Sequence, residues 1–282
     1  MAPFVLPPWI VLDPLLDSWL REDIGRGDRA SAGLTGIKTA QWQVKSAGRI
    51  AGLGVAARIF QRLNPEVQFV PLLPEGADCD PQTIVAEITG PIGDLLMGER
   101  SALNLVMRLS GIATATDLYA AQIADLPTQL VDTRKTTPGL RILEKYATTV
   151  GGGISHRQGL DDGAMIKDNH IAAAGGIREA VTLVRESLPY PLTIEVEVES
   201  IEQLDVAMEC GVEIIMSDNM PVPMMEVAVD VCRKHAPHIK LEASGNITLE
   251  TIRSVAETGV DYISTSAPIT RSPWLDLSMR II

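Results

Sequence analysis

The stretch LTIEVEVESIEQLDVAMECGVEIIMSDN, residues 192–219, sets the fold class expected for this chain. In residues 192–198, apolar and polar side chains alternate, as they do in a strand. The apolar residues of 201–211 have the spacing of a helix, and this segment ends at a glycine. Residues 212–219 have a strand-like pattern again. A strand, a helix and a second strand in this order make a βαβ unit, which builds a parallel sheet.

The same alternation extends through the second half of the chain. At least six candidate strands lie between Gln129 and Ala267, each separated from the next by a helical or glycine-rich segment. We therefore predict an α/β barrel, TIM-like but incomplete, over residues 111–270. No G-x-G-x-x-G follows any of these strands, which disfavours a dinucleotide-binding open sheet. Residues 1–110 contain short alternating runs broken by Pro and Gly, so we expect a smaller N-terminal α+β sandwich domain there.

Composition limits the possible partners. The chain has 282 residues, 46% hydrophobic content and a formal net charge of −12, which argues against a nucleic-acid partner because that binding needs a broad basic face. Its three cysteines form no C-x-x-C pair, so we expect reduced residues in a cytoplasmic protein. The apolar segment 1–12 contains three prolines and is too short to span a membrane, and we expect it to form a strand or loop.

Basic side chains are concentrated in one part of this acidic chain, between Asp132 and Ile171. A single Arg or Lys is usually a solvated surface residue. Several basic side chains that lie together at strand ends and in glycine-rich loops are less easily explained as surface residues. In a barrel, the carboxyl ends of the strands carry the active site. We therefore predict a site for a multiply anionic ligand, whose candidate residues are Arg134, Lys135, His156, Arg157 and Lys167.

Acidic residues of the same half suggest a metal. Alternation places Glu195, Glu197 and Glu199 on one face of a strand, and at least one of them needs a cation or metal partner inside a barrel. Glu197 with Asp218 could hold Mg²⁺ among oxygen ligands; alternatively, Glu197 simply forms an ion pair with Lys167. ASGNIT, residues 243–248, could be an ordinary strand-to-helix loop, but backbone N–H groups at a helix start bind phosphate well, so we expect a phosphate-binding loop there.

Several motifs together resemble one family. GERSALN, DTRKTTPGLR, GGGISHRQGL, MIKDNHI and LEASGNIT are similar to motifs of the quinolinate phosphoribosyltransferases, the carboxylating nicotinate-nucleotide pyrophosphorylases. The resemblance covers nearly the whole chain. It implies an N-terminal sandwich domain completed by residues 271–282, and a homo-oligomer, either a dimer or a hexamer of dimers. It also implies transfer of phosphoribosyl from phosphoribosyl pyrophosphate to quinolinate with decarboxylation, giving nicotinate mononucleotide for NAD biosynthesis.

The resemblance also implies roles for individual residues. The five basic and imidazole residues named above would bind the quinolinate carboxylates and phosphates, and Arg100 would be donated across the dimer interface. Lys167, Glu197 and Asp218 would be catalytic, the two acids lying near the ribose and a Mg²⁺ cofactor. The remaining substrate-binding residues would be Thr133, Ser244, Gly245, Asn246, Thr265, Ser266 and Ala267.

This chain departs from the usual motifs at a few positions. Ser155 stands where the family has asparagine and Ser266 where glycine is common, while Pro268 and Arg271 alter the last loop. A serine hydroxyl still donates to phosphate, so we expect altered detail and retained function. Two other readings stay open at this point: a related protein of the same fold associated with metal transport, and a non-catalytic sensor of phosphoribosyl ligands.

Overall fold

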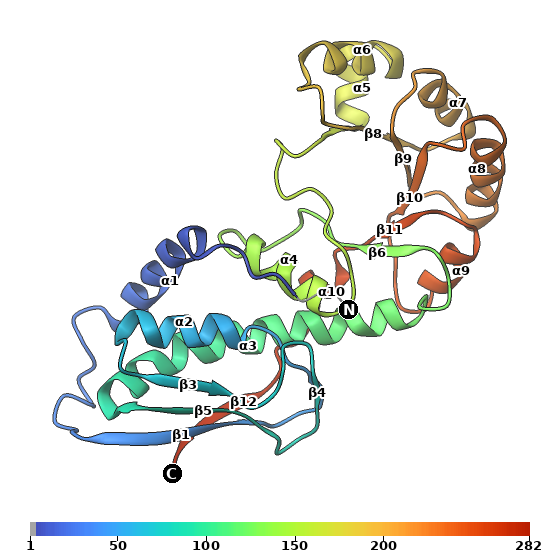
Figure 1. Ribbon diagram of the computed structural model, residues 1–282. Coiled ribbons are helices and arrows are strands. Elements are labelled where there is room, and N and C mark those ends of the chain that lie inside the picture. The colour runs from blue at the N-terminus through green and yellow to red at the C-terminus, as the bar shows by residue number, and fades with distance from the viewer. Residues whose placement is uncertain (1–3) are drawn as a thin grey trace. The chain divides into compact units, whose positions relative to one another are not determined.

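The computed structural model describes residues 4–282, which form two compact units (Figure 1). The first contains residues 4–117, 137–152 and 271–282, and the second contains residues 118–136 and 153–270. Each unit has its own sheet. The domain boundary that the sequence places near residue 110 stays a prediction.

The first unit is built on a four-stranded antiparallel sheet of order β12-β1-β5-β3. Strand β12 comes from the end of the chain and pairs with β1, with Ala40 opposite Ile281. A two-stranded sheet pairs β2 with β4. The strands are β1 (Ile37–Val44), β2 (Gly48–Arg49), β3 (Gln68–Pro71), β4 (Asp78–Cys79), β5 (Ile84–Pro91) and β12 (Leu277–Ile281).

Aromatic packing joins this sheet to a helix. Trp42 of β1 is fully buried and meets Phe69 of β3 edge-on, with ring centroids 5.4 Å apart. Phe60 of α2 packs against the same tryptophan at 6.3 Å. The helices of this unit are α1 (Trp9–Ile24), α2 (Leu53–Leu63), α3 (Ile92–Ala121), whose last four residues belong to the second unit, and α4 (Arg141–Val150).

Helix α1 corrects one expectation. We predicted a strand or loop for segment 1–12. Residues 4–8 are indeed loop, but the chain is helical from Trp9 onward, and residues 1–3 lie outside the described part. The buried residues Leu12, Leu16 and Leu20 recur every four positions, which is a helical period. That period is visible only beyond residue 12, so the apolar start taken alone could not reveal it.

The second unit contains six parallel strands in the order β6-β11-β10-β9-β8-β7, which confirms the incomplete α/β barrel. The end strands β6 and β7 do not pair within the described residues; Ile154, between them in sequence, bridges to Val131. The strands are β6 (Gln129–Val131), β7 (Ala164–Ile166), β8 (Ile194–Val198), β9 (Ile214–Asp218), β10 (Lys240–Ser244) and β11 (Tyr262–Ser264).

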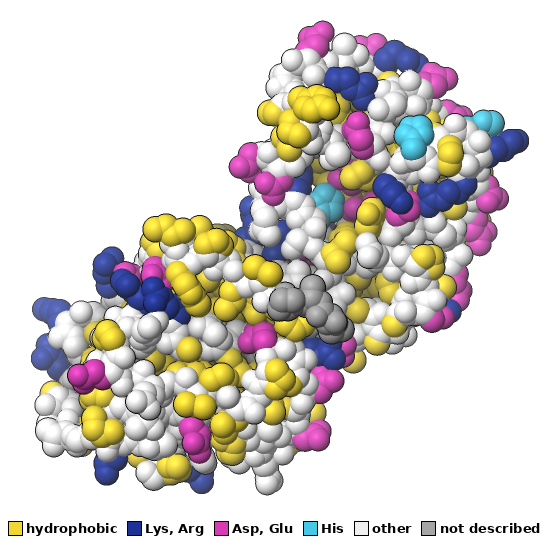
Figure 2. Space-filling view, in the orientation of Figure 1, with side chains coloured by type: hydrophobic (Ala, Val, Ile, Leu, Met, Phe, Trp, Pro, Cys, Tyr) yellow, Lys and Arg dark blue, Asp and Glu magenta, His cyan; other side chains and the backbone are white. Residues whose placement is uncertain are grey.

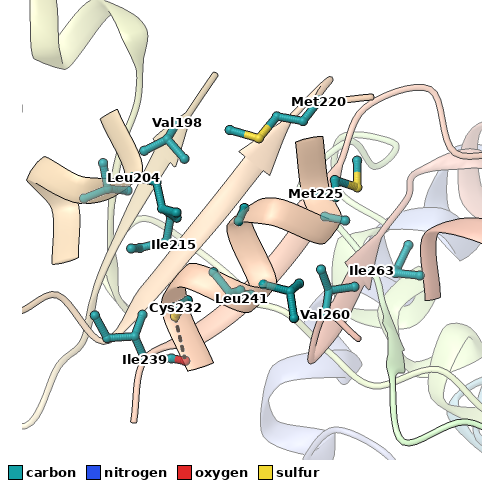
Figure 3. Packing of buried hydrophobic residues seen from close by; sticks show 14 of the residues in the cluster. Val198, Leu204, Ile215, Met220, Met225, Cys232, Ile239, Leu241, Val260 and Ile263 are labelled. Atoms are coloured by element: carbon teal, nitrogen blue, oxygen red, sulfur yellow. Dashed lines mark hydrogen bonds between the residues drawn. The ribbon is translucent and has the colours of Figure 1, made fainter. Parts of the chain in front are cut away.

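Helices cover the outside of these strands (Figure 1). Side chains such as Ile215 of β9 and Leu241 of β10 pack against helix residues such as Met225, and the Cys232 thiol donates to the Ile239 carbonyl (Figure 3). The helices are α5 (Asp168–Ala174), α6 (Ile177–Ser187), α7 (Ile201–Glu209), α8 (Val222–His235), α9 (Ile252–Glu257) and α10 (Ala267–Thr270).

The surface agrees with the acidic composition. On the face drawn in Figure 2, Lys and Arg side chains are interspersed with Asp and Glu, and the described residues form no continuous basic area there. Among residues 4–282, no helix is both long enough and apolar enough to cross a bilayer.

Candidate active site

A cavity of about 550 Å³ lies at the carboxyl ends of the barrel strands, and we call it the mouth cavity. Parallel strands end at the same side of a sheet, which is why side chains far apart in sequence meet here. The cavity is lined by Asp132, Thr133, Arg134, Lys135, His156, Arg157, Met165, Lys167, Glu197, Met216, Asp218, Asn219, Glu242, Ser244, Gly245, Asn246 and Ser264.

Two arginines of this lining lie close enough to repel each other. Burial lowers the pKa of the Arg157 guanidinium, and the nearby positive charge of Arg134 lowers it further. An arginine still keeps its proton at neutral pH. The Arg157 NH1 group donates to the Gly163 carbonyl at 2.9 Å, which holds the side chain in place. Two fixed like charges at one cavity favour an anionic ligand that neutralises both.

Lys167 and Glu197 form an ion pair inside the cavity lining. Lys167 directly follows β7, and Glu197 is the fourth residue of β8. The ion-pair reading that the sequence left open is therefore present, while both residues also line the mouth cavity. The Lys167 side chain is 42% exposed, so its ammonium group stays accessible to a ligand.

The loop of Gly245 and Asn246, which follows β10, forms part of the rim of the mouth cavity, and its conformation is restricted. Gly245 has φ +99°, and an added Cβ would lie 2.2 Å from the Asn219 side-chain oxygen, so only glycine fits there. Asn246 donates to the same oxygen at 3.0 Å. The expected helix start is wrong: α9 begins only at Ile252, because a turn at residues 248–251 intervenes.

A charged cluster lies below the rim. The Nε2 atom of His156 is 3.2 Å from Glu195 and 3.4 Å from Glu242, and both glutamates are almost fully buried. Burial lowers the pKa of His156, but the hydrogen bonds to the two carboxylates outweigh it and raise the pKa to about 10. The backbone N–H of Arg157 points at Nδ1 from 2.8 Å and opposes a second proton there. A pKa this high would put a proton on both ring nitrogens, whereas the Arg157 N–H favours an Nδ1 without one. In either state Nε2 carries a proton, and that proton lies between the two carboxylates.

Family models match both parts of the chain. Residues 35–110 match the quinolinate phosphoribosyl transferase N-terminal domain, and residues 112–280 match the C-terminal domain. The chain belongs to the quinolinate phosphoribosyl transferase family.

Relatives and solved structures agree with this assignment. A probable carboxylating nicotinate-nucleotide pyrophosphorylase of Synechocystis is 57% identical over 98% of this chain and 95% of the relative. The human carboxylating nicotinate-nucleotide pyrophosphorylase is 39% identical over 98% of this chain and 93% of the relative. The crystal structure of NadC from Streptococcus pyogenes matches with a TM-score of 0.93 at 37% identity, covering 99% of both chains.

Most of the residues expected from the quinolinate phosphoribosyl transferase resemblance line this one cavity. The structure brings together Thr133, Arg134, Lys135, His156, Arg157, Lys167, Glu197, Asp218, Ser244, Gly245 and Asn246. Their assignment to substrate stays a prediction.

Four expected residues are not among the lining. Thr265 and Ala267 are buried and hydrogen-bond to each other, and Ser266 starts the turn into α10. The neighbouring Ser264 lines the cavity in their place. Arg100 lies on α3 in the first unit, with its side chain 57% exposed.

Sequence reasoning missed two acidic residues of the site. Glu242 lines the mouth cavity, and Asp132 accepts a hydrogen bond from the His156 backbone N–H at 2.9 Å. A signal for Glu242 was present, since an acid inside the strand KLEAS must either face solvent or find a partner. The partner, His156, is far away in sequence and could not be identified from the strand.

Proposed function

We propose that this protein catalyses phosphoribosyl transfer from phosphoribosyl pyrophosphate to the ring nitrogen of quinolinate, with loss of the C2 carboxylate as CO₂. The products are nicotinate mononucleotide, pyrophosphate and CO₂. One observation carries the proposal: Arg134, Lys135, Arg157 and Lys167 line the same cavity as the carboxylates of Glu197 and Asp218. Family membership supports it independently.

The cations match the charges of the two substrates. Quinolinate has two carboxylates, and the donor substrate has a phosphate and a pyrophosphate group. Arginine binds carboxylate and phosphate through paired hydrogen bonds, while lysine acts as a mobile point charge. Release of Lys167 from Glu197 would free that ammonium for an anionic substrate, so the ion pair is compatible with binding.

Positioning and charge can supply the catalysis. The ring nitrogen attacks the anomeric carbon of the ribose while pyrophosphate leaves. The carboxylates of Glu197 and Asp218 can stabilise the positive charge that develops on the sugar. The pyridinium formed then stabilises the carbanion left at C2 by loss of CO₂, and this carbon takes up a proton from solvent to give nicotinate mononucleotide. No covalent nucleophile is needed for either step.

The acidic pair fits a magnesium cofactor. Both carboxylates supply the hard oxygen ligands that Mg²⁺ prefers, and Asp218 already has one oxygen hydrogen-bonded to the Asn219 side chain at 3.0 Å. We propose that Glu197 and Asp218 hold the ion, directly or through its waters. When bound, Mg²⁺ neutralises the negative charge of the pyrophosphate leaving group.

We further propose a homo-oligomer in which Arg100 of one subunit serves the partner's site. Its side chain is largely exposed and its one ion pair among the described residues is with the adjacent Glu99, at 3.4 Å. A cytoplasmic location belongs to the same proposal and is supported by the three free cysteines.

An assay of the purified protein tests the activity. Quinolinate, phosphoribosyl pyrophosphate and Mg²⁺ should yield pyrophosphate and CO₂ in equal amounts. Nicotinic acid, which lacks the C2 carboxylate, should be a very poor substrate, because one cation of the mouth cavity then loses a charge-assisted hydrogen bond of about 1.5 to 3 kcal/mol. Comparable turnover of the two acids would contradict the proposal, and binding of both substrates without turnover would indicate a sensor.

A further inference from the structure

Glu195 and Glu242 occupy a position in the barrel where apolar side chains are the rule. Both point into the barrel from alternate strands, β8 and β10, and a layer of a barrel interior is normally made of branched apolar residues from alternate strands. They are only 3% and 2% exposed. A buried carboxylate loses its hydration, so the fold is expected to keep it only where it serves a purpose.

Stability does not explain this pair. The Oε1 atoms of both glutamates are buried and have no hydrogen-bond partner among residues 4–282. One histidine nitrogen lies within hydrogen-bonding distance of both acids, and the second oxygen of each acid has no partner of its own among these residues. Replacing such a group by an apolar residue of similar volume is often neutral or stabilising.

The cluster separates two cavities. A second cavity of about 280 Å³ is lined by residues at the amino ends of the strands, including Ala164, Ile214 and Tyr262, and we call it the base cavity. His156, Arg157 and Glu242 line both the base cavity and the mouth cavity. The cluster therefore forms the floor of the mouth cavity.

One hydrogen bond connects this floor to Arg157. The Nε2 proton of His156 is held by Glu195 and Glu242, and Nδ1 accepts the backbone N–H of Arg157. Rotation of the imidazole would break these contacts, whereas the hydrogen bond from the Arg157 side chain to the Gly163 carbonyl would remain. His156 thus has both ring nitrogens occupied within the protein.

We infer that Glu242 and Glu195 are positioning residues, which hold His156 and through it Arg157 for the quinolinate carboxylates. The inference rests on the proposed function. It assigns the glutamates no contact with substrate.

The test uses Glu242→Met and Glu195→Met in the full-length protein. Each should keep or raise the melting temperature, because a buried charge is removed at similar volume. The KM for quinolinate should rise about tenfold or more, while the KM for phosphoribosyl pyrophosphate changes less than about threefold. Glu242→Gln should recover part of the loss, since its amide oxygen still accepts the Nε2 proton. Glu226→Met, at an exposed site on α8, is the matched control.

Calorimetric titration with quinolinate measures the same effect without turnover. A wild-type protein that fails to turn over quinolinate would overturn the proposed function. An active wild type whose Met variants stay folded and keep both KM values would overturn this inference alone. If a Met variant does not fold, Leu replaces Met at that position, because Leu also removes the acceptor for the Nε2 proton. An unchanged quinolinate affinity in the folded Leu variant would also overturn the inference.

Discussion

Asp218 is the last residue of β9 and lines the mouth cavity beside Asn219, whose backbone has φ +53°. A left-handed backbone at a non-glycine residue is uncommon, and such positions cluster at functional sites. Asn246, on the neighbouring loop, has φ +51° and donates to Asn219. The left-handed backbone of Asn219 and Asn246, together with their hydrogen bond, holds this part of the rim in one conformation.

Asp218→Asn should lower the affinity for magnesium phosphoribosyl pyrophosphate about tenfold or more and leave quinolinate binding largely intact. The amide keeps the shape of the side chain but removes the charge that a hard cation prefers. Calorimetry with each ligand separates the two effects, and Asp230→Asn on the exposed side of α8 is the control. Loss of quinolinate binding alone would contradict the assigned role.

At the scale of elements, helix α2 has an unusual cap. Gly52 precedes it and has no side chain, and the carboxylate of Glu75 instead accepts the Gly52 backbone N–H. Burial raises the pKa of Glu75, opposed by hydrogen bonds from Gly52, Tyr146 and Leu53. A distant residue therefore satisfies an N–H group that sequence reasoning would expect a local cap to satisfy.

This cap predicts a pH dependence of stability. A carboxyl group whose pKa is raised by folding favours the folded state below its unfolded pKa, and this contribution is lost as pH rises through the folded pKa. Relative to the wild type, Glu75→Gln should therefore gain stability as pH rises from about 4 and level off above the folded pKa. Urea unfolding of both proteins across this range measures the difference. A difference that does not vary with pH would show that Glu75 titrates alike in both states.

At the scale of the whole molecule, the exposed Arg100 on α3 predicts a shared site. Arg100→Ala and Lys167→Ala should each fold, assemble and be nearly inactive. After subunit exchange, a mixed dimer would carry both defects in one site and neither in the other. Activity should then return to about a quarter of wild type for random reassortment of a twofold dimer.

Two controls make this mixing experiment decisive. Subunit exchange is followed with differently tagged chains, and Arg253→Ala on α9, an exposed arginine, replaces Arg100→Ala in a parallel mixture. Demonstrated exchange without recovery would mean that Arg100 acts in its own chain or not at the site.

The sequence alone determined the barrel, its strands and most of the lining of the mouth cavity. The alternation of side chains in a strand and their spacing in a helix are local properties of the sequence. The residues that follow parallel strands always lie at the same edge of the sheet. The cations between Asp132 and Ile171 could therefore be grouped without coordinates. The motifs also led to the family before any comparison of structures.

Only the tertiary structure decided which groups pair. The contacts of His156 with Glu195 and Glu242 join segments that are 39 and 86 residues apart in the chain, and no local pattern specifies a partner at such a distance. The same holds for Glu75 capping α2 and for β12 pairing with β1. Local propensity depends on neighbours in sequence, whereas a buried charge is satisfied by whatever the fold brings within hydrogen-bonding distance.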